Sequence, residues 1–399
     1  MQLLSTKQKD DVLSSMMRIL DESRLAILDA NAKDCALFDP ADRAMYDRLV
    51  LDDKKVDGMI KAVKAIMDRK DPIGIVKSEW YHENGMKVVN KTSPFGTIMI
   101  IYESRPDVTI EAAVVAFKSN NKILLKGGKE AKYSNKVLVE CWHRALAENN
   151  LSNDWITFLE LDRTSTQSYL KNPPVNIDLI VPRGGDGLIK FVKDHARCAV
   201  LVSGRGNNFL YVHDDADWSK TIDVILNAKT QKISACNALD KILIHSEIKH
   251  FEKRVEGINQ ILENHDVQVQ IDSSLNSILT SNEMIESEEV WSEEFLAMRI
   301  VMGSVKSMDE AIEKINKHSG GHSVSIMTQN NLIAQSFMDQ IDSAAVYHNA
   351  STRFTDGGEL GIGAELAIST DKLHHRGPLG LDQLVTNKWY VYGDGQVRS

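Results

Sequence analysis

From residue 96 onward, short apolar runs alternate with longer segments of helical periodicity. Five apolar runs have the length of a buried strand: 97–102, 122–126, 157–159, 178–181 and 199–202. Helical periodicity separates them at 109–118, 130–148 and 186–196. Short strands that alternate with helices form βαβ units, which require a parallel sheet. The chain is therefore predicted to be an α/β protein that binds its ligand at the carboxyl ends of its strands.

A second α/β series follows Cys236. Its apolar runs at 241–245 and 299–301 are predicted strands, and 246–263 and 308–318 have helical periodicity. The chain has 399 residues. That length exceeds what one hydrophobic core usually organises, so we expect two or three domains, two of them with open parallel sheets.

The two ends of the chain have different patterns. Residues 8–35 and roughly 52–69 are predicted helices, whereas 75–92 is typical of a β-hairpin that turns at Asn84-Gly85. Residues 388–392 have strand composition. Exposed strand edges invite pairing, so the hairpin and this last strand are candidates for an oligomer interface.

Composition and charge exclude several classes of protein. The net charge is −9, which argues against nucleic acid or an anionic membrane as the main partner, because both require a basic face. The first twenty residues contain no apolar signal segment, and no run is long enough to span a bilayer. The four cysteines are too scattered for zinc or a disulfide framework. We therefore expect no metal and a cytoplasmic location.

Cys236 lies in a segment of small residues, Ser234-Ala235-Cys236-Asn237-Ala238. Small neighbours let a substrate carbonyl approach the thiol, and backbone N–H groups there can donate to an oxyanion. A thiolate is a strong nucleophile when its surroundings favour ionisation. A lone cysteine is nevertheless more often a buried structural residue, so the segment alone leaves both interpretations open.

Two glycine pairs stand between a predicted strand and a predicted helix. They occur in Lys126-Gly127-Gly128-Lys129 and in Arg183-Gly184-Gly185. Glycines let the backbone approach a phosphate, and lysines contact phosphate or ribose. A tight turn with solvated lysines explains the first pair equally well. No complete G-x-G-x-x-G pattern occurs, so the ordinary dinucleotide fingerprint is absent.

Two further loops each offer an arginine. Glu103-Ser104-Arg105 follows a predicted strand, and Arg353 lies within the polar stretch from Asn349 to Glu359. An arginine can bind a carboxylate or a phosphate through two parallel hydrogen bonds. Loop arginines are more often plain surface charge. His322 is a candidate base, although a structural position near a helix end is the commoner role for such a residue.

Taken together, these segments resemble the γ-glutamyl phosphate reductase family (glutamate-5-semialdehyde dehydrogenases) of the aldehyde dehydrogenase superfamily. The resemblance covers nearly the whole chain and rests on the number and order of modest motifs: Ala30-Asn31-Ala32-Lys33-Asp34, Pro94-Phe95-Gly96, Tyr102-Glu103-Ser104-Arg105-Pro106, Lys126-Gly127-Gly128, Pro182-Arg183-Gly184-Gly185, Asn227-Ala228-Lys229-Thr230-Gln231, Cys236-Asn237-Ala238, Asn349 to Gly358, and Arg376-Gly377-Pro378-Leu379-Gly380-Leu381.

The resemblance implies the aldehyde dehydrogenase fold: two open parallel-sheet domains and a small β oligomerisation element. A nucleotide-binding domain would occupy 1–225, with 75–92 as a protruding hairpin. A catalytic domain would occupy 226–375, and the tail 376–399 would return to the oligomerisation element. The implied reaction is NADPH-dependent reduction of L-glutamate 5-phosphate to L-glutamate 5-semialdehyde, the second step of proline biosynthesis from glutamate.

The resemblance also implies roles for individual residues. Cys236 would form the thioester, with Asn237 beside it in the catalytic set. The residues implied in cofactor binding are Lys126, Gly127, Gly128, Lys129, Gly184, Gly185 and Glu294. The residues implied in substrate binding are Glu103, Ser104, Arg105, Arg353, Thr355 and Asp356. Lys129 stands near where NAD-preferring relatives carry a ribose-binding glutamate. A cation there suits a 2′-phosphate, which favours NADP.

The chain departs from oxidising aldehyde dehydrogenases at one informative place. Those enzymes carry a glutamate, in a Glu-Leu-Gly-Gly stretch, that activates water to hydrolyse the thioester. The comparable segment here, residues 201–206, contains no carboxylate. Loss of that base would protect the thioester from water and favour exchange with phosphate.

Two other functions remain open at this stage. One is an aldehyde dehydrogenase with another substrate, including a CoA-acylating type, which also lacks the hydrolytic base. The other is a catalytically silent binding protein of the same fold. The family further implies a homo-oligomer. A third possibility is that the chain is the reductase half of a two-enzyme pathway channel, functionally coupled to a glutamate 5-kinase that would be a separate protein, because the chain contains no kinase-like extension.

Overall fold

The computed structural model describes residues 2–39, 41–202 and 204–398. The chain divides into two compact units. The first contains residues 1–202, 361–367 and 378–399, and the second contains residues 203–360 and 368–377. Within the described residues, no helix has the length and apolar character needed to cross a membrane.

The first unit is built on a parallel five-stranded sheet with the strand order β5-β4-β3-β6-β7. Its strands are β3 (Thr97–Tyr102), β4 (Lys122–Lys126), β5 (Ile156–Phe158), β6 (Leu179–Arg183) and β7 (Ala199–Val200). The helices among them are α5 (Val108–Lys118), α6 (Lys132–Glu148), α7 (Arg163–Lys171) and α8 (Asp186–His195). The alternation predicted from residue 96 is confirmed, and α7 is an additional helix.

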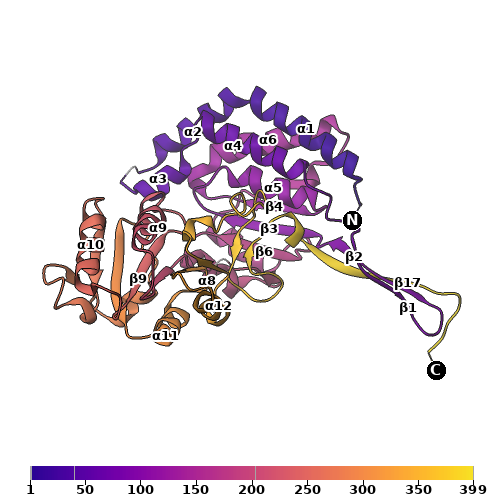
Figure 1. Ribbon diagram of the computed structural model, residues 1–399. Helices are drawn as coiled ribbons and strands as arrows, with labels where there is room; N and C mark the ends of the chain where they lie inside the picture. The colour runs from indigo at the N-terminus through magenta and orange to yellow at the C-terminus, as the bar shows by residue number, and fades with distance from the viewer. Residues whose placement is uncertain (1, 40, 203, 399) are drawn as a thin grey trace. The chain divides into compact units, whose positions relative to one another are not determined.

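Both faces of this sheet are covered, which explains why its strands are almost uniformly apolar. Along β3, Ile98 and Ile100 pack against α5 and α6 in the larger core. Met99 and Ile101 point the other way, into a smaller core with α7 and α8. Figure 1 shows the N-terminal helices as a further layer on the α5–α6 side.

The N-terminal helices differ from the single helix predicted over 8–35. The structure has α1 (Thr6–Glu22) and α2 (Arg24–Leu37), with Ser23 between them. Ser23 has φ −91° and ψ 4°, which leaves the helical region and breaks the axis. The pattern concealed this break because the apolar positions keep a helical spacing through it. Helices α3 (Arg43–Leu49) and α4 (Asp53–Met67) follow.

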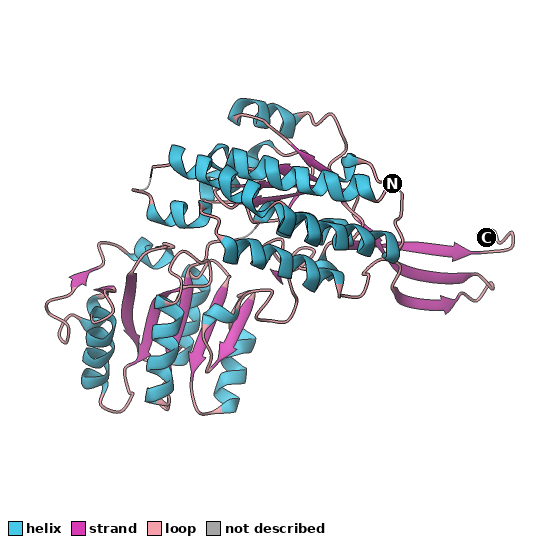
Figure 2. Cartoon of the chain, turned by 90° about the horizontal axis from the view of Figure 1, so that it is seen from above, coloured by secondary structure: helices cyan, strands magenta, loops and turns pink. Residues whose placement is uncertain are grey.

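A three-stranded antiparallel sheet extends from this unit as an arm. The hairpin strands β1 (Val76–Tyr81) and β2 (Lys87–Pro94) pair with each other, and β17 (Val385–Tyr392) pairs with β2. Gly85, in the predicted turn, has φ +89°, a conformation that glycine adopts without strain. Figures 1 and 2 show the arm projecting from the helical layer, with the C-terminus near its tip.

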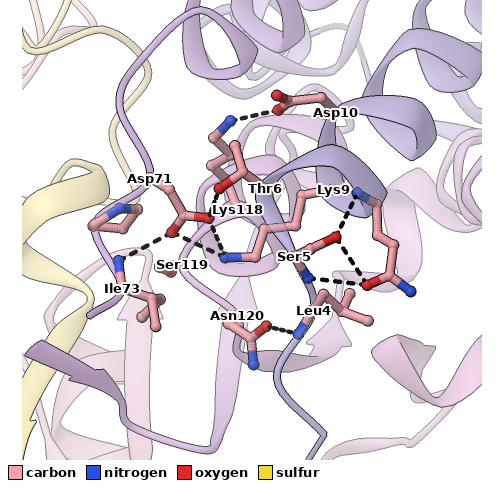
Figure 3. A network of polar contacts seen from close by, with 12 residues as sticks. Leu4, Ser5, Thr6, Lys9, Asp10, Asp71, Ile73, Lys118, Ser119 and Asn120 are labelled. Atoms are coloured by element: carbon pink, nitrogen blue, oxygen red, sulfur yellow. Dashed lines mark hydrogen bonds and ion pairs between the residues drawn. The ribbon is translucent and has the colours of Figure 1, made fainter. Parts of the chain in front are cut away.

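A buried polar network anchors the base of the arm (Figure 3). Lys9 on α1 is fully buried and its Nζ lies 2.8 Å from the Asp71 carboxylate. The same carboxylate accepts the backbone N–H of Ile73 at 3.0 Å, three residues before β1. Lys118, at the end of α5, forms an ion pair with Asp10. These contacts fix the start of the hairpin to α1 and, through α1, to α5.

The second unit is a parallel seven-stranded sheet with the order β11-β10-β12-β9-β8-β13-β14. Its strands are β8 (Asn208–Val212), β9 (Leu239–His245), β10 (Gln268–Ile271), β11 (Glu283–Met284), β12 (Arg299–Val305), β13 (Ser323–Met327) and β14 (Ala345–His348). Its helices are α9 (Trp218–Thr230), α10 (Phe251–Glu263), α11 (Met308–His318) and α12 (Asn331–Gln340). The short strands β15 (Ile368–Ser369) and β16 (Gly377–Pro378) lie where the chain passes between units.

The helices of this unit also cover both faces of its sheet. On β8, Leu210 and Val212 pack with α9 and α10. Phe209 and Tyr211 face the opposite core, with α11 and α12. The prediction of two open parallel sheets and a small β element is confirmed.

Candidate active site

In the first unit, the strand order reverses at β3, because β4 pairs on one side of it and β6 on the other. Such a reversal leaves a crevice outside the carboxyl ends of the strands, where α/β proteins bind nucleotides. Three predicted segments follow these strand ends: 103–105 after β3, 126–129 at and after β4, and Gly184-Gly185 after β6. The fold therefore gathers at one sheet edge most of the residues implied in cofactor binding.

Lys126, the last residue of β4, is a partly buried cation. Its Nζ donates to the Gly127 carbonyl at 3.1 Å. Burial lowers the pKa of Lys126, although the carboxylates of Glu130 and Glu103 act in the opposite direction. Burial likewise raises the pKa of Glu103. A lysine held this way has a fixed direction and a strengthened charge interaction with a polar ligand.

The N-terminus of α8 faces the Glu103 carboxylate at this edge, and the Gly185 N–H donates to Glu103 Oε2 at 3.4 Å. Gly185 is the N-cap residue and supplies no side-chain hydrogen bond to the helix. A Cβ at Gly185 would have no neighbour within 4 Å. Uncapped N–H groups at a helix N-terminus attract phosphate, and the helix dipole adds to that attraction. The half-buried Lys126 and the glycines at this helix end are of the kind that hold a nicotinamide dinucleotide, and Glu103 must release the Gly185 N–H before a phosphate can bind there.

The other predicted residues of this edge are engaged within the unit. Ser104 is fully buried, and its N–H and Oγ donate to a Glu130 carboxylate oxygen at 2.6 and 3.0 Å. Arg105 forms ion pairs with Asp107 at 2.9 Å and with Glu111 at 3.8 Å. Lys129 is exposed in a short 3-10 turn. Nearby carboxylates thus already balance the charge of Arg105.

In the second unit, Cys236 lies in the loop between α9 and β9, three residues before β9. Its backbone is in tight contact with Gly206. A Cβ built on Gly206 would lie 2.0 Å from the Cys236 carbonyl oxygen and 2.6 Å from its Cα. Only glycine fits there without displacing the nucleophile's backbone.

Asn208 holds the same loop through its side-chain amide. Its Nδ2 lies 2.8 Å from the carbonyl oxygens of Gly206 and Cys236 and 2.7 Å from that of Ala238. Its Oδ1 accepts the Ser323 N–H at 3.1 Å. Asn208 is completely buried, so it locks the cysteine loop to the amino ends of β8 and β13.

Asn237 joins the loop that carries Cys236 to the loop that carries Arg353. Its Nδ2 donates to the carbonyls of Arg353 and Thr355 at 3.1 and 2.9 Å. Thr352 Oγ1 donates back to the Asn237 carbonyl at 2.7 Å. Two segments more than a hundred residues apart in the sequence thus form one rigid pair of loops around Cys236.

Arg353 is half-buried beside these loops. Its Nε donates to Gln231 Oε1 at 2.9 Å, while its Nη1 is buried with no hydrogen-bond partner among the described residues. Burial lowers the pKa of Arg353, and the charges of Cys236, Asp356 and Glu359 oppose that shift. An unpaired buried guanidinium nitrogen is costly unless an anion binds to it.

Thr355 is buried and Asp356 is exposed. Thr355 Oγ1 lies 2.7 Å from Ser323 Oγ and 2.8 Å from the Tyr347 hydroxyl, whereas Asp356 Oδ1 accepts the Gly358 N–H in a local turn. His322 Nδ1 lies 2.7 Å from Ser323 Oγ. Burial lowers the pKa of His322 to about 4. His322 therefore stays neutral at neutral pH and contacts Ser323, which in turn contacts Thr355. These contacts give His322 a structural role and not that of a catalytic base.

Sequence reasoning missed Gly206 and Asn208. The only signal was the incomplete glycine pattern Gly204-Arg205-Gly206, and nothing local linked it to a cysteine thirty residues later. Glu294, by contrast, lies where an extended segment leads into β12 and is half-buried. Ser203, in the segment that lacks the hydrolytic carboxylate, lies outside the described residues.

One group of possible metal ligands occurs among the described residues. His213, Asp214 and Asp215 each bring a ligand atom within 4.8 Å of the others. Hydrogen bonds already join His213 Nδ1 to Asp215 at 2.9 Å and Thr328 Oγ1 to the same carboxylate oxygen at 2.6 Å. These contacts explain the cluster as a hydrogen-bonded structural group.

Known proteins were compared with the chain as a whole. No family model matches it. The gamma-glutamyl phosphate reductase of Thermotoga maritima is 42% identical over 397 residues, which are 99% of this chain and 95% of that protein. The gamma-glutamyl phosphate reductase of Enterococcus faecalis is 40% identical over 399 residues, covering 100% of this chain and 95% of that protein.

Solved structures agree with these matches. The crystal structure of the Thermotoga maritima gamma-glutamyl phosphate reductase has a TM-score of 0.92 at 41% identity, covering 99% of this chain and 95% of that chain. An acetylating aldehyde dehydrogenase from Geobacillus thermoglucosidasius has a TM-score of 0.72 at 17% identity, covering 99% of this chain and 94% of that chain. The second likeness shows the aldehyde dehydrogenase fold alone.

Proposed function

The chain belongs to the γ-glutamyl phosphate reductase family, and we propose that it reduces L-glutamate 5-phosphate to L-glutamate 5-semialdehyde through a thioester on Cys236. This is the second step of proline biosynthesis from glutamate. The observation that carries the proposal is the double loop around Cys236, in which Gly206, Asn208 and Asn237 fix the nucleophile beside Arg353.

The first half of the reaction transfers the acyl group to the enzyme. The Cys236 sulfur attacks the γ-carbonyl carbon, the bond from that carbon to the phosphate oxygen breaks, and phosphate leaves with the electron pair. The positive charge of Arg353 acts on Cys236, and a cation near a thiol favours the reactive thiolate. The backbone N–H of Cys236 is our candidate donor to the oxyanion, a contact typically worth about 3 kcal/mol of barrier.

The second half reduces the thioester. A bound nicotinamide cofactor supplies the hydride for that reduction. Collapse of the resulting tetrahedral hemithioacetal breaks the carbon–sulfur bond, releases the aldehyde and returns Cys236 to the thiolate. The segment 201–206 offers no carboxylate to activate water, so the thioester survives until reduction.

For the cofactor we propose NADPH, held by Lys126, Gly127, Gly128, Gly184, Gly185 and Glu294. The half-buried Lys126 and the glycine N-cap of α8 support a dinucleotide in the first unit. The exposed Lys129 supports a 2′-phosphate, because its ammonium group is available to pair with one. The ratio of kcat/KM for NADP and NAD decides this preference, and a ratio below one would refute it.

Of the two candidate arginines, we propose that Arg353 binds an anionic end of the substrate. Arg105 already forms ion pairs with Asp107 and Glu111, whereas Arg353 keeps a buried Nη1 without a partner among the described residues. Thr355 adds a hydroxyl to the same loop, and Asp356 is our candidate for the substrate ammonium group. Glu103 and Ser104 follow β3 directly, and we propose that they line the substrate site at the carboxyl end of that strand.

Arg353→Ala is expected to raise KM for glutamate 5-semialdehyde about tenfold to a hundredfold, because a charge-assisted hydrogen bond to the substrate is lost. NADP binding should stay unchanged. Initial rates over a range of substrate concentrations test this, with Arg105→Ala as the matched arginine variant. Normal saturation by substrate in Arg353→Ala would exclude the proposed contact.

The arm supports a homo-oligomer. Its sheet exposes Trp80, Trp389 and Val391, at 44%, 52% and 55% of their surface, and the two indole rings pack edge to face at 5.5 Å. An exposed apolar sheet with unpaired edges is typical of a strand-pairing interface. We propose that a second copy of the chain covers it; light scattering that shows only monomers at micromolar concentration would refute this.

The substrate is an acyl phosphate, so we also propose functional coupling to a separate glutamate 5-kinase that makes it. We place both reactions in the cytoplasm. None of the four cysteines is in a disulfide, which suits a reducing compartment.

A further inference from the structure

Three charged side chains are buried beneath the segment that carries Glu294. Lys229 on α9 and Lys241 on β9 are fully buried, and Asp240 on β9 is 2% exposed. Lys229 Nζ lies 2.9 Å from Asp240 Oδ1. None of the three belongs to the nucleophile loop or to the residues proposed to contact substrate or cofactor.

These side chains hold the backbone on both sides of Glu294. Lys241 Nζ donates to the Glu293 carbonyl at 2.8 Å. Asp240 Oδ2 accepts the N–H of Phe295 at 2.9 Å. The residue before Glu294 and the residue after it are therefore each fixed by a charged side chain from β9.

The ring of Phe295 adds a third attachment. Lys241 Nζ lies 3.5 Å from the ring centroid, and the guanidinium carbon of Arg299 lies 4.3 Å from it. Cations over the face of an aromatic ring are attracted to it, more strongly where water is excluded. Phe295 cannot turn away without losing these contacts, which leaves Glu294 little freedom.

Stability alone does not account for such a cluster. Burying charges is costly, and well-packed apolar residues often serve stability as well or better. Burial lowers the pKa of Lys229 and lowers that of Lys241 to about 7, against the opposing charge of Asp240. Because these buried charges destabilise the fold, their presence indicates that the neighbouring backbone must be held in a defined position.

The strand β9, which carries Asp240 and Lys241, also begins beside the nucleophile. β9 starts at Leu239, three residues after Cys236, and Asn208 holds the carbonyls of Cys236 and Ala238. The loop that carries Cys236 thus leads directly into β9, and the second and third residues of β9, Asp240 and Lys241, hold the segment around Glu294. The two are built on a common rigid element.

We propose that Lys229, Asp240 and Lys241 are positioning residues that hold Glu294 where it binds the nicotinamide ribose, in register with Cys236. The inference rests on the proposed function, which gives Glu294 its cofactor role. Charged residues that act through a neighbour in this way are part of the support that a precise site requires.

The test measures NADPH binding without turnover, by fluorescence titration, in Lys241→Met. Loss of the hydrogen bond to Glu293 is expected to weaken NADPH binding about tenfold, since small misplacements of a contact are costly. The matched control is Lys314→Met. Lys314 also pairs with an aspartate, Asp272, and lies 3.9 Å from the Trp291 ring centroid, and both of these partners lie outside the Glu293–Phe295 segment. The Lys314→Met variant should bind NADPH with the affinity of the wild type.

A double-mutant cycle separates positioning from general destabilisation. If Lys241 acts through Glu294, then Lys241→Met adds no further loss of NADPH affinity in a Glu294→Ala background. Additive losses would overturn the inference. An unchanged dissociation constant in folded Lys241→Met would overturn it too. If Lys241→Met does not fold, the same cycle is run with Asp240→Asn, which keeps the side-chain volume.

The outcome is distinguishable from failure of the proposed function. The rate at which iodoacetamide alkylates Cys236 should be the same in wild type and Lys241→Met, because the nucleophile loop keeps its own supports. A wild-type protein that binds NADPH but turns over no glutamate 5-semialdehyde would defeat the proposed function. Wild-type turnover with unaltered NADPH affinity in the variants would defeat only the positioning role.

Discussion

Cys236→Ala is expected to lower the rate of glutamate 5-semialdehyde oxidation by at least about 10⁴-fold, because no covalent intermediate can form without the nucleophile. The protein should still fold, since Cys236 is half-buried and its loop is held by backbone and by Asn208. NADPH affinity should not change. The measurement is the initial rate of NADPH formation, with thermal unfolding as the check on folding.

Cys35→Ala is the matched control for this variant. Cys35 is also a partly buried cysteine outside any disulfide, but it lies on α2 in the first unit. Its replacement should leave the rate within about twofold of wild type, the range usual for a substitution away from the site. Equal losses in both variants would indicate damage to the fold, and substantial activity in Cys236→Ala would contradict a thioester mechanism.

Gly206→Ala is expected to lower kcat about 10²-fold, because the new methyl group must displace the backbone of Cys236. An added Cβ at Gly206 would lie 2.0 Å from the Cys236 carbonyl oxygen, far inside contact distance. Backbone, unlike the end of a flexible side chain, cannot move aside cheaply. The loss should appear as slow alkylation of Cys236 by iodoacetamide as well as slow turnover, with KM for NADP unchanged.

Gly257→Ala is the control for glycine replacement in the same unit. Gly257 lies within α10 and a Cβ there meets nothing within 4 Å. The change should leave kcat intact and stabilise the protein by about 0.5–1 kcal/mol, since alanine favours a helix interior more than glycine does. If Gly206→Ala behaves like Gly257→Ala, the close approach to Cys236 has no catalytic importance.

Much of the fold was predictable from local pattern. The alternation from residue 97 to residue 200 marked β3, β4 and β6 because buried parallel strands are short apolar runs. The turn at Asn84-Gly85 marked the hairpin because few other sequences adopt that geometry readily. The break at Ser23 escaped prediction, since α1 and α2 keep their apolar faces in a common period across it.

The candidate site was predictable only as separate pieces. Motifs identified Cys236 and Arg353, but the hydrogen bonds from Asn237 that join their loops depend on how the chain returns after β14. The contact between Gly206 and Cys236 depends on the pairing of β8 with β9. Lys241 is an ordinary lysine in the sequence, and only the tertiary structure shows it buried. Local patterns report residue chemistry, whereas such contacts arise from topology.

The most direct test of the central claim is the reverse reaction with and without inorganic phosphate. Purified protein is given glutamate 5-semialdehyde and NADP, and NADPH formation is followed at increasing phosphate concentration; NAD is compared in the same assay. A phosphate-dependent, saturable rate is predicted, because phosphate is the acceptor of the acyl group from Cys236. NADPH formation that is unaffected by phosphate would contradict the account and indicate a hydrolysing aldehyde dehydrogenase instead.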